Sequence, residues 1–170
     1  MAIPAELESI SSQDSDGSIA QGIHREVVTF SGAGVGLSNY QLLPEQSGAL
    51  VIFNSLTGNL VTLPSPVAGM WFEFMSQIAP TSNETKIVTK LVATEFILGS
   101  IISASETVAE GMDVFTANGS THVSVSMNGT TTGGEVGTRL VLTALNTTQW
   151  LIKGVNQGSG GAVVDPFDTT

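Results

Sequence analysis

From residue 25 onwards, short runs of apolar residues alternate with clusters of turn-forming residues. The alternation is clearest in residues 121–127, where Val123, Val125 and Met127 would share one face of a strand. Valine, isoleucine, threonine and aromatic residues dominate such runs, because branched and ring side chains pack well on a pleated sheet. The pattern predicts strands over residues 26–30, 49–54, 59–63, 69–78, 85–92, 96–103, 121–127, 136–145 and 148–155.

Asparagine marks four of the connections between these runs, at residues 54–59, 118–119, 128–129 and 146–147. Asparagine and glycine tolerate the positive φ angles of tight turns, so these connections suit hairpins. Strands separated by about 8–12 residues favour an antiparallel arrangement over strand–helix–strand units. We therefore predict an all-β domain over residues 25–156, built as an antiparallel β-sandwich or a small β-barrel.

Two segments outside this domain differ from it in composition. Residues 1–24 contain four carboxylates and no lysine or arginine, which predicts an extended N-terminal arm. Residues 157–170 begin with a glycine- and serine-rich stretch that predicts a flexible C-terminal tail. The alternatives are that the segments dock on a neighbouring protein or that both are disordered. Docking would use their apolar residues as anchors, namely Ile3, Leu7, Ile10, Val163, Val164 and Phe167.

Composition narrows the functions to consider. The 170 residues include 15 acidic and five basic side chains, for a net charge of −10. This balance argues against a nucleic-acid partner and against an anionic membrane, because both require clustered lysine and arginine. No apolar run approaches the ~20 residues of a membrane-spanning helix. The first residues lack a Sec-type signal pattern, so we expect synthesis in the cytoplasm.

Catalytic chemistry has little support in the sequence. The absence of cysteine excludes disulfides, thiolate catalysis and cysteine-ligated zinc. His24 and His122 are the two histidines, and neither accompanies a nucleophile motif. The glycine run of residues 32–36 lacks the spacing of a phosphate-binding loop, and residues 14–17 lack the remaining ligands of a calcium loop. We therefore expect neither an enzyme nor a bound metal or cofactor.

The two tryptophans differ in their surroundings. Trp71 shares its strand face with Glu73, which places it at a rim or an interface rather than in the core. Trp150 begins the last predicted strand and is expected to pack inside. An alternative role for Trp71, or for the polar loop of residues 128–133, is contact with a sugar.

Two stretches resemble a known group of proteins. Residues 48–78 contain a strand, a turn, the strand end "VTLPSP" and the run "GMWFEF", and residues 135–155 form a closing hairpin with the pattern "GTRLVL…WLIKG". Together they are similar to the small β-domains of tailed-bacteriophage virion proteins, particularly the capsid decoration or cement proteins. The likeness covers about residues 25–156 and does not include the arm or the tail.

The resemblance implies a structural virion protein that is made in the host bacterial cytoplasm. It implies binding to the exterior of an assembled capsid, with the major capsid protein as partner, and bracing of the head against internal pressure. A small homo-oligomer, preferably a trimer, fits such a role. Related β-domains occur in phage fibres, so the alternative is a fibre or tail component that binds a host-surface glycan.

Overall fold

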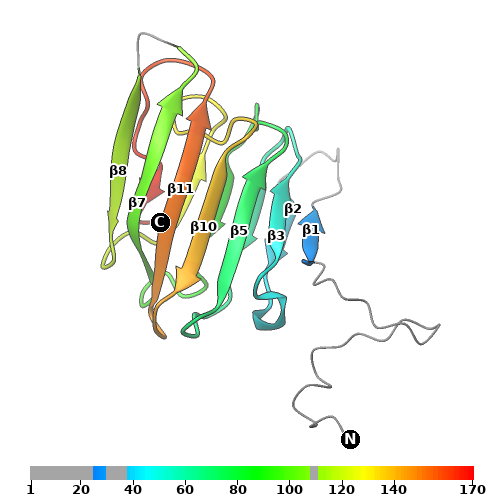
Figure 1. The fold of residues 1–170 in the computed structure, drawn as a ribbon, viewed down its shortest axis with the longest axis vertical. Helices are drawn as coiled ribbons and strands as arrows, with labels where there is room; N and C mark the ends of the chain where they lie inside the picture. Colours follow the sequence, from blue (N-terminus) through cyan, green and yellow to red (C-terminus); the bar gives the residue numbers. More distant parts are fainter. Residues whose placement is uncertain (1–24, 30–37, 108–110) are drawn as a thin grey trace, which may run out of the picture.

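A computed structural model of the chain describes residues 25–29, 38–107 and 111–170. Its strands divide between two sheets, of which the five-stranded one is the fainter layer behind the other in Figure 1. The first sheet has the order β1 (Val27–Thr29), β3 (Leu50–Phe53), β5 (Trp71–Ser76), β10 (Arg139–Ala144), β11 (Gln149–Gly158), β7 (Phe96–Ser105) and β8 (Met112–Asn118). The second has the order β12 (Phe167–Asp168), β9 (Ser124–Met127), β6 (Thr85–Val88), β4 (Asn59–Thr62) and β2 (Ser38–Gln41).

The chain passes from one sheet to the other at each step from β1 to β7. As a result β1, β3 and β5 lie parallel in the first sheet, and β2, β4 and β6 lie parallel in the second. Residues 27, 50 and 73 lie side by side across the first sheet, 23 positions apart each time. A parallel pair needs a crossover connection, and here a strand of the opposite sheet serves as that crossover.

The second half of the chain adds antiparallel pairs. β7–β8 and β10–β11 are hairpins within the first sheet, and β10 inserts antiparallel to β5. β9 pairs antiparallel with both β6 and β12. The prediction of an all-β chain is confirmed, but the sheets are mixed rather than antiparallel throughout. The barrel alternative is wrong, because the outermost strands β1 and β8 of the first sheet do not pair with each other.

Both sheets contribute to one hydrophobic core. Phe53 and Phe74 stack with ring centroids 5.9 Å apart, and Phe72 lies 6.0 Å from the fully buried Trp150. Burying one such side chain stabilises the fold by about 1.5–3 kcal/mol. Residues on the strands of the second sheet, or directly after one of them, complete the same cluster, namely Val61, Leu63, Ile87, Val125, Met127 and Phe167.

The structure adds elements that the sequence pattern did not predict, namely β2, β8, β12 and a short 3-10 helix, η1 (Pro44–Gln46). β12 belongs to the segment predicted as a flexible tail. There β11 continues to Gly158, and Phe167 pairs with Val125 of β9 and is 8% exposed. Phe167 thus packs in the core of its own chain, because its position on a paired strand turns the ring inwards.

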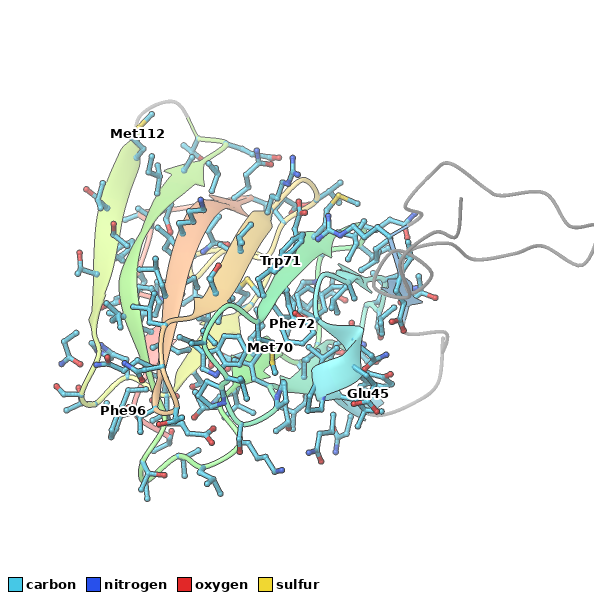
Figure 2. The ribbon with its side chains drawn as sticks, turned by 60° about the horizontal axis from the view of Figure 1, so that its bottom comes forward. Glu45, Met70, Trp71, Phe72, Phe96 and Met112 are labelled. Atoms are coloured by element: carbon cyan, nitrogen blue, oxygen red, sulfur yellow. The ribbon has the colours of Figure 1, made fainter. Side chains whose placement is uncertain are left out.

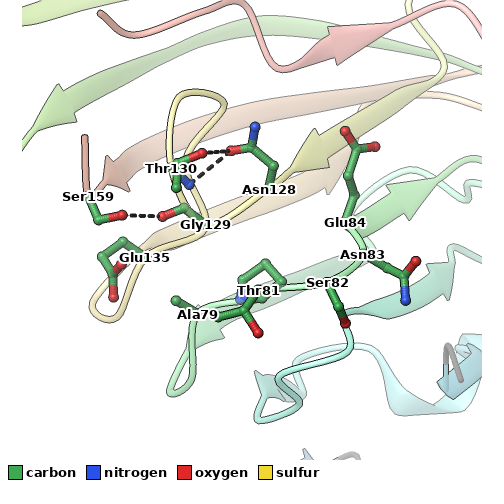
Figure 3. A pocket seen from close by; sticks show the side chains of 11 residues that line it. Ala79, Thr81, Ser82, Asn83, Glu84, Asn128, Gly129, Thr130, Glu135 and Ser159 are labelled. Atoms are coloured by element: carbon green, nitrogen blue, oxygen red, sulfur yellow. Dashed lines mark hydrogen bonds between the residues drawn. The ribbon is translucent and has the colours of Figure 1, made fainter. Parts of the chain in front are cut away.

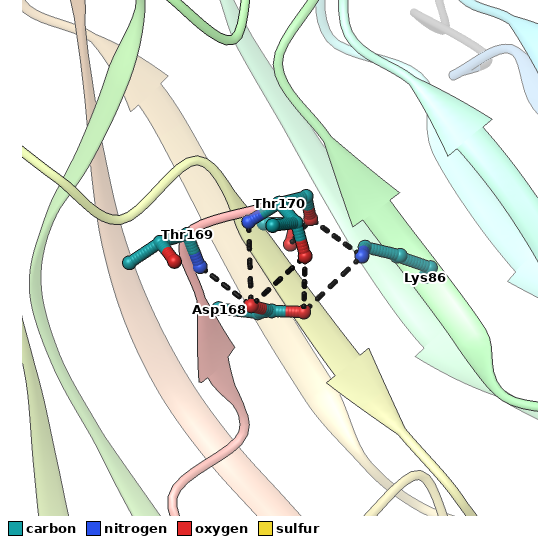
Figure 4. A network of polar contacts seen from close by, with 5 residues as sticks. Lys86, Asp168, Thr169 and Thr170 are labelled. Carbon is teal, nitrogen blue, oxygen red and sulfur yellow. Dashed lines mark hydrogen bonds and ion pairs between the residues drawn. The ribbon is translucent and has the colours of Figure 1, made fainter.

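The last residues are also held by polar contacts (Figure 4). Lys86 Nζ donates to the Thr170 carbonyl oxygen at 2.6 Å and contacts the Asp168 carboxylate at 3.4 Å. Burial raises the pKa of Asp168, but hydrogen bonds from Thr169 and Thr170 and the charge of Lys86 outweigh burial and lower it. The ion pair and β12 together attach residues 167–170 to the second sheet.

Candidate interaction surface

The first sheet has one side in the core and one side away from it, which we call the outer face. Along β5 the rings of Phe72 and Phe74 point into the core, whereas Trp71, Glu73 and Met75 alternate with them. Strand pairing aligns the outward residues of neighbouring strands in rows. One row crosses five strands and carries a single charged side chain: Met75, Arg139, Val155, Ile102 and Val114.

Glu73 is the centre of a compact group of charges, which we call the ion cluster (Arg25, Glu73 and Arg139). The Glu73 carboxylate accepts hydrogen bonds from Arg25 Nη1 on one oxygen and from Arg139 Nε on the other. Glu73 is 5% exposed, so burial raises its pKa. The hydrogen bonds and charges of the two arginines outweigh burial and hold the pKa below the ordinary value of 4.5.

Arg25 links this cluster to Trp71. Its guanidinium carbon lies 4.8 Å from the centre of the Trp71 ring, a cation–π distance. Its Nε also donates to the Gly48 carbonyl oxygen at 2.7 Å. Trp71 remains 39% exposed on the outer face. The sequence placed Trp71 on one strand face with a carboxylate, and the structure adds the two arginines that complete the site.

A shallow hollow lies beside the ion cluster. We call it the outer hollow; it measures about 290 Å³. Its lining is Arg139, Val141, Lys153, Gly154 and Val155. In the register of β10 and β11, Arg139 lies opposite Val155 and Val141 lies opposite Lys153, so the two cations occupy diagonal corners. Gly154 has φ 150°, and a Cβ there would lie 2.2 Å from the Arg139 carbonyl oxygen, which requires glycine.

Beyond the hollow, β7 and β8 expose a group of apolar side chains, the apolar patch (Ile102, Met112 and Val114). Ile102 pairs directly with Val114, and their exposed fractions are 41% and 63%. Met112 is 67% exposed and lies at the start of β8, far along the sheet from Trp71 (Figure 2). Large apolar side chains gathered on adjacent strands mark a surface suited to contact with another protein.

A polar cleft lies between the loops that precede β6 and β10 (Figure 3). It measures about 430 Å³ and is lined by hydroxyl, amide and carboxylate groups of residues 79–84, 128–130, 135 and 159. Asn128 Oδ1 accepts hydrogen bonds from the backbone of Thr130 and Thr132, which shapes the loop wall. The lining contains no aromatic ring.

Among the described residues, the predicted interface residues are not gathered on one surface. Val164 is half exposed and donates its N–H to the Thr131 carbonyl oxygen, whereas Phe167 is buried beside His122. Val163 is partly buried in the same segment, which follows the second sheet, while Trp71 lies on the first. The remaining anchors lie outside the described residues: Ile3, Leu7 and Ile10. His24 and the runs 14–17 and 32–36 lie outside them too.

His122 has a structural place. Its Nδ1 accepts a hydrogen bond from the Asn118 backbone at 3.0 Å. Within the described ranges, no group of three or more histidine, cysteine or acidic residues is arranged to hold a metal ion. None of the helical segments described is long and apolar enough to cross a membrane.

Comparison with known proteins yields no matching family model, no matching curated protein and no matching solved structure. The resemblance to phage decoration proteins therefore stays a prediction from the sequence motifs.

The sequence pattern missed two parts of the outer face. Arg25 and Arg139 are 114 positions apart, and no local pattern brings them to Glu73. The patch on β8 did have a signal, because Met112, Val114 and Thr116 alternate with Asp113, Phe115 and Ala117. A strand assignment for residues 112–118 would have placed Met112 and Val114 on one face.

Proposed function

We propose that the protein is a structural virion component that binds the exterior of an assembled tailed-phage capsid and stabilises it. The observation that carries the proposal is the outer face, where apolar side chains of β7 and β8 are exposed beside few charges. Such a surface favours burial against another protein. The motif likeness over residues 48–78 and 135–155 supports the major capsid protein as that partner.

On this proposal the two sheets act as a sandwich-type domain that presents the apolar patch to the capsid. In the capsid-bound state, residues 1–24 and Val164 provide additional contacts, either to the capsid or to a sister subunit in a small oligomer, preferably a trimer. Several tethered contacts raise the strength of attachment without enlarging any one of them. On this proposal the protein stabilises the capsid by burying an interface in each of many copies, and no chemical step is involved.

The first test is the molar ratio of this chain to the major capsid protein in purified particles. A ratio of one, or a simple fraction of one, is expected for a protein distributed over the capsid lattice. A few copies per particle would move the protein to the tail or a fibre. Absence from particles would overturn the proposal.

A second test addresses the surface. The double variant Ile102→Thr and Val114→Thr keeps β-branched residues but replaces apolar groups with hydroxyls. It is expected to bind undecorated capsids about tenfold more weakly, a loss of about 1.4 kcal/mol. The matched control is Val67→Thr with Val92→Thr, two exposed valines that lie in loops away from the patch. Equal binding by both double variants would remove the apolar patch from the interface.

A second candidate function, binding of a host-surface glycan, is favoured by the polar cleft, because residues 128–130 of the predicted sugar-contacting loop line it. On this alternative the isolated protein is retained on host surface polysaccharide, and Ser82→Ala with Glu84→Gln reduces retention. These side chains line the cleft but lie outside the core. No retention of the unmodified protein would remove this candidate.

A further inference from the structure

The outer face concentrates positive charge on an otherwise acidic protein. Three of the five basic residues of the chain lie on it, namely Arg25, Arg139 and Lys153. Within the described part of the chain, Lys153 forms no ion pair. Arg139 uses Nε for Glu73, and its side chain is 68% exposed. The outer hollow therefore offers an apolar floor, Val141 and Val155, between two accessible cations.

The N-terminal segment has the complementary composition. Residues 1–24 contain Glu6, Glu8, Asp14 and Asp16 and no basic residue. Leu7 stands between two of these carboxylates. An apolar side chain flanked by acidic groups matches a hollow with an apolar floor and two cationic corners.

The point of attachment favours contact within one chain. The segment joins the described residues at Arg25, which lies on the outer face against Trp71 and Glu73. Extended, 24 residues can span up to about 80 Å. The seven strands of the sheet span about 29 Å from first to last. Tethering also raises the local concentration of the segment to about the millimolar range.

We propose that residues 1–24 dock on the outer face of their own chain, with Leu7 at the outer hollow and the flanking carboxylates at Arg139 and Lys153. The docked segment shields this part of the sheet and neutralises its excess positive charge. The apolar patch on β7 and β8 lies beyond the hollow and stays available to a partner. The inference concerns the free protein and does not depend on capsid binding.

The test uses the full chain, which contains no native cysteine. A nitroxide spin label on Leu7→Cys relaxes nearby amide protons, and the signals of a ¹⁵N-labelled protein report which residues these are. We expect strong loss of signal for Val141, Lys153 and Val155 and little loss for β4 and β6. Unchanged signals over β10 and β11 would overturn the proposal.

A mixture identifies whose segment docks. Spin-labelled chains without ¹⁵N are combined with ¹⁵N-labelled chains that carry no spin label. Docking within one chain predicts no loss of signal in this mixture. Loss over β10 and β11 there would show docking on a second copy and would overturn the proposal in its present form.

Charge variants test the recognition itself. Lys153→Glu in the spin-labelled chain is expected to restore the signals of Val141 and Val155 several-fold. Lys90→Glu makes the same change of charge at an exposed loop position and is expected to leave the loss of signal in place. Amide signals of the second sheet confirm that both variants are folded. An equal loss of signal in the two variants would overturn a role for Lys153 in binding the segment.

Discussion

The outer face of the first sheet has two regions that differ in how their side chains are engaged. On β5 and β10, Glu73 is paired with two arginines, and Arg25 also covers Trp71. On β7 and β8, Ile102 and Val114 lie directly opposite each other, and their side chains are 41% and 63% exposed. Both regions belong to one continuous sheet with regular pairing.

This difference indicates that the β5 and β10 region serves the stability of the fold and that the β7 and β8 region serves binding. A buried carboxylate destabilises the fold unless charged hydrogen bonds satisfy it. The ion cluster therefore has a structural role, because it holds β5, β10 and Arg25 together. Exposed apolar side chains contribute little to the stability of the fold, and their burial by a partner favours binding. Substitutions on β5 should therefore change stability, and substitutions on β8 should change binding.

The largest effect is expected beneath the outer face. Phe74 of β5 is 1% exposed and stacks on Phe53, so Phe74→Ala should lower the free energy of unfolding by about 4 kcal/mol. Phe115 of β8 is partly buried, and Phe115→Ala should cost about 2 kcal/mol, because part of its ring already contacts water. Urea denaturation measures both values. Equal losses would show that β8 is packed as tightly as β5.

The next effect concerns the carboxylates. Glu73→Gln removes the charge that satisfies Arg25 and Arg139 and should cost about 2 kcal/mol, a value kept modest by the exposure of Arg139. Asp113→Asn makes the same change on β8, where no ion pair involving Asp113 is present among the described residues. It should change stability by less than about 0.5 kcal/mol. A comparable loss in both variants, measured by urea denaturation, would contradict the comparison.

Acid should weaken the β5 region through the same carboxylate. The pKa of Glu73 is lower in the folded protein than its ordinary value of 4.5, so the unfolded chain binds more protons near that pH. Stability is therefore retained above the unfolded pKa and is lost as pH falls towards the folded pKa. Asp168, whose pKa is also lowered, adds to the loss. Thermal unfolding from pH 6 downwards should show a smaller decline in Glu73→Gln than in the unmodified protein, and an identical decline would contradict the assignment.

The smallest effect on stability is expected from the apolar patch. Ile102→Thr and Val114→Thr, each alone, should change the free energy of unfolding by less than about 0.5 kcal/mol. The residues keep their strand propensity and lose little buried area. Urea denaturation of each variant, with Val67→Thr as reference, checks this. A loss above 1 kcal/mol would assign the patch a role in the fold.

Local patterns predicted the strands better than their partners. Nine predicted runs correspond to observed strands, because alternation and β-branched residues act over a few positions. Asparagine also located turns correctly: Asn118, Asn128 and Asn146 each accept a backbone hydrogen bond two residues on. Only the connection at Asn146 closes a hairpin within one sheet, whereas those at Asn118 and Asn128 pass between the sheets. The same side-chain chemistry therefore marks a turn without selecting the strand that follows as a partner.

Only part of the candidate site could be predicted from the sequence, namely the outward face of β5 and not the partners of Glu73. The alternation of Trp71 and Glu73 with two phenylalanines indicated an outward face on β5, and the structure shows that face. The partners of Glu73 come from residues 25 and 139, so their approach depends on how β1, β5 and β10 are arranged. Phe167 was predicted as an anchor for a neighbouring protein, but it pairs with Val125 of β9 in its own chain. Its short, isolated apolar run contains no pattern that indicates this pairing.

The amino-acid sequence was enough to predict the all-β character, the positions of most strands and turns, the acidic charge and the absence of cysteine chemistry, because these follow from side chains and their near neighbours. Tertiary structure alone decided that β1 to β7 alternate between two sheets, that parallel and antiparallel pairs coexist, and that Arg25, Glu73 and Arg139 meet. The physical reason is that strand pairing satisfies backbone groups that are alike in every residue. The choice of partner is therefore made by packing of the shared core, to which residues throughout the chain contribute.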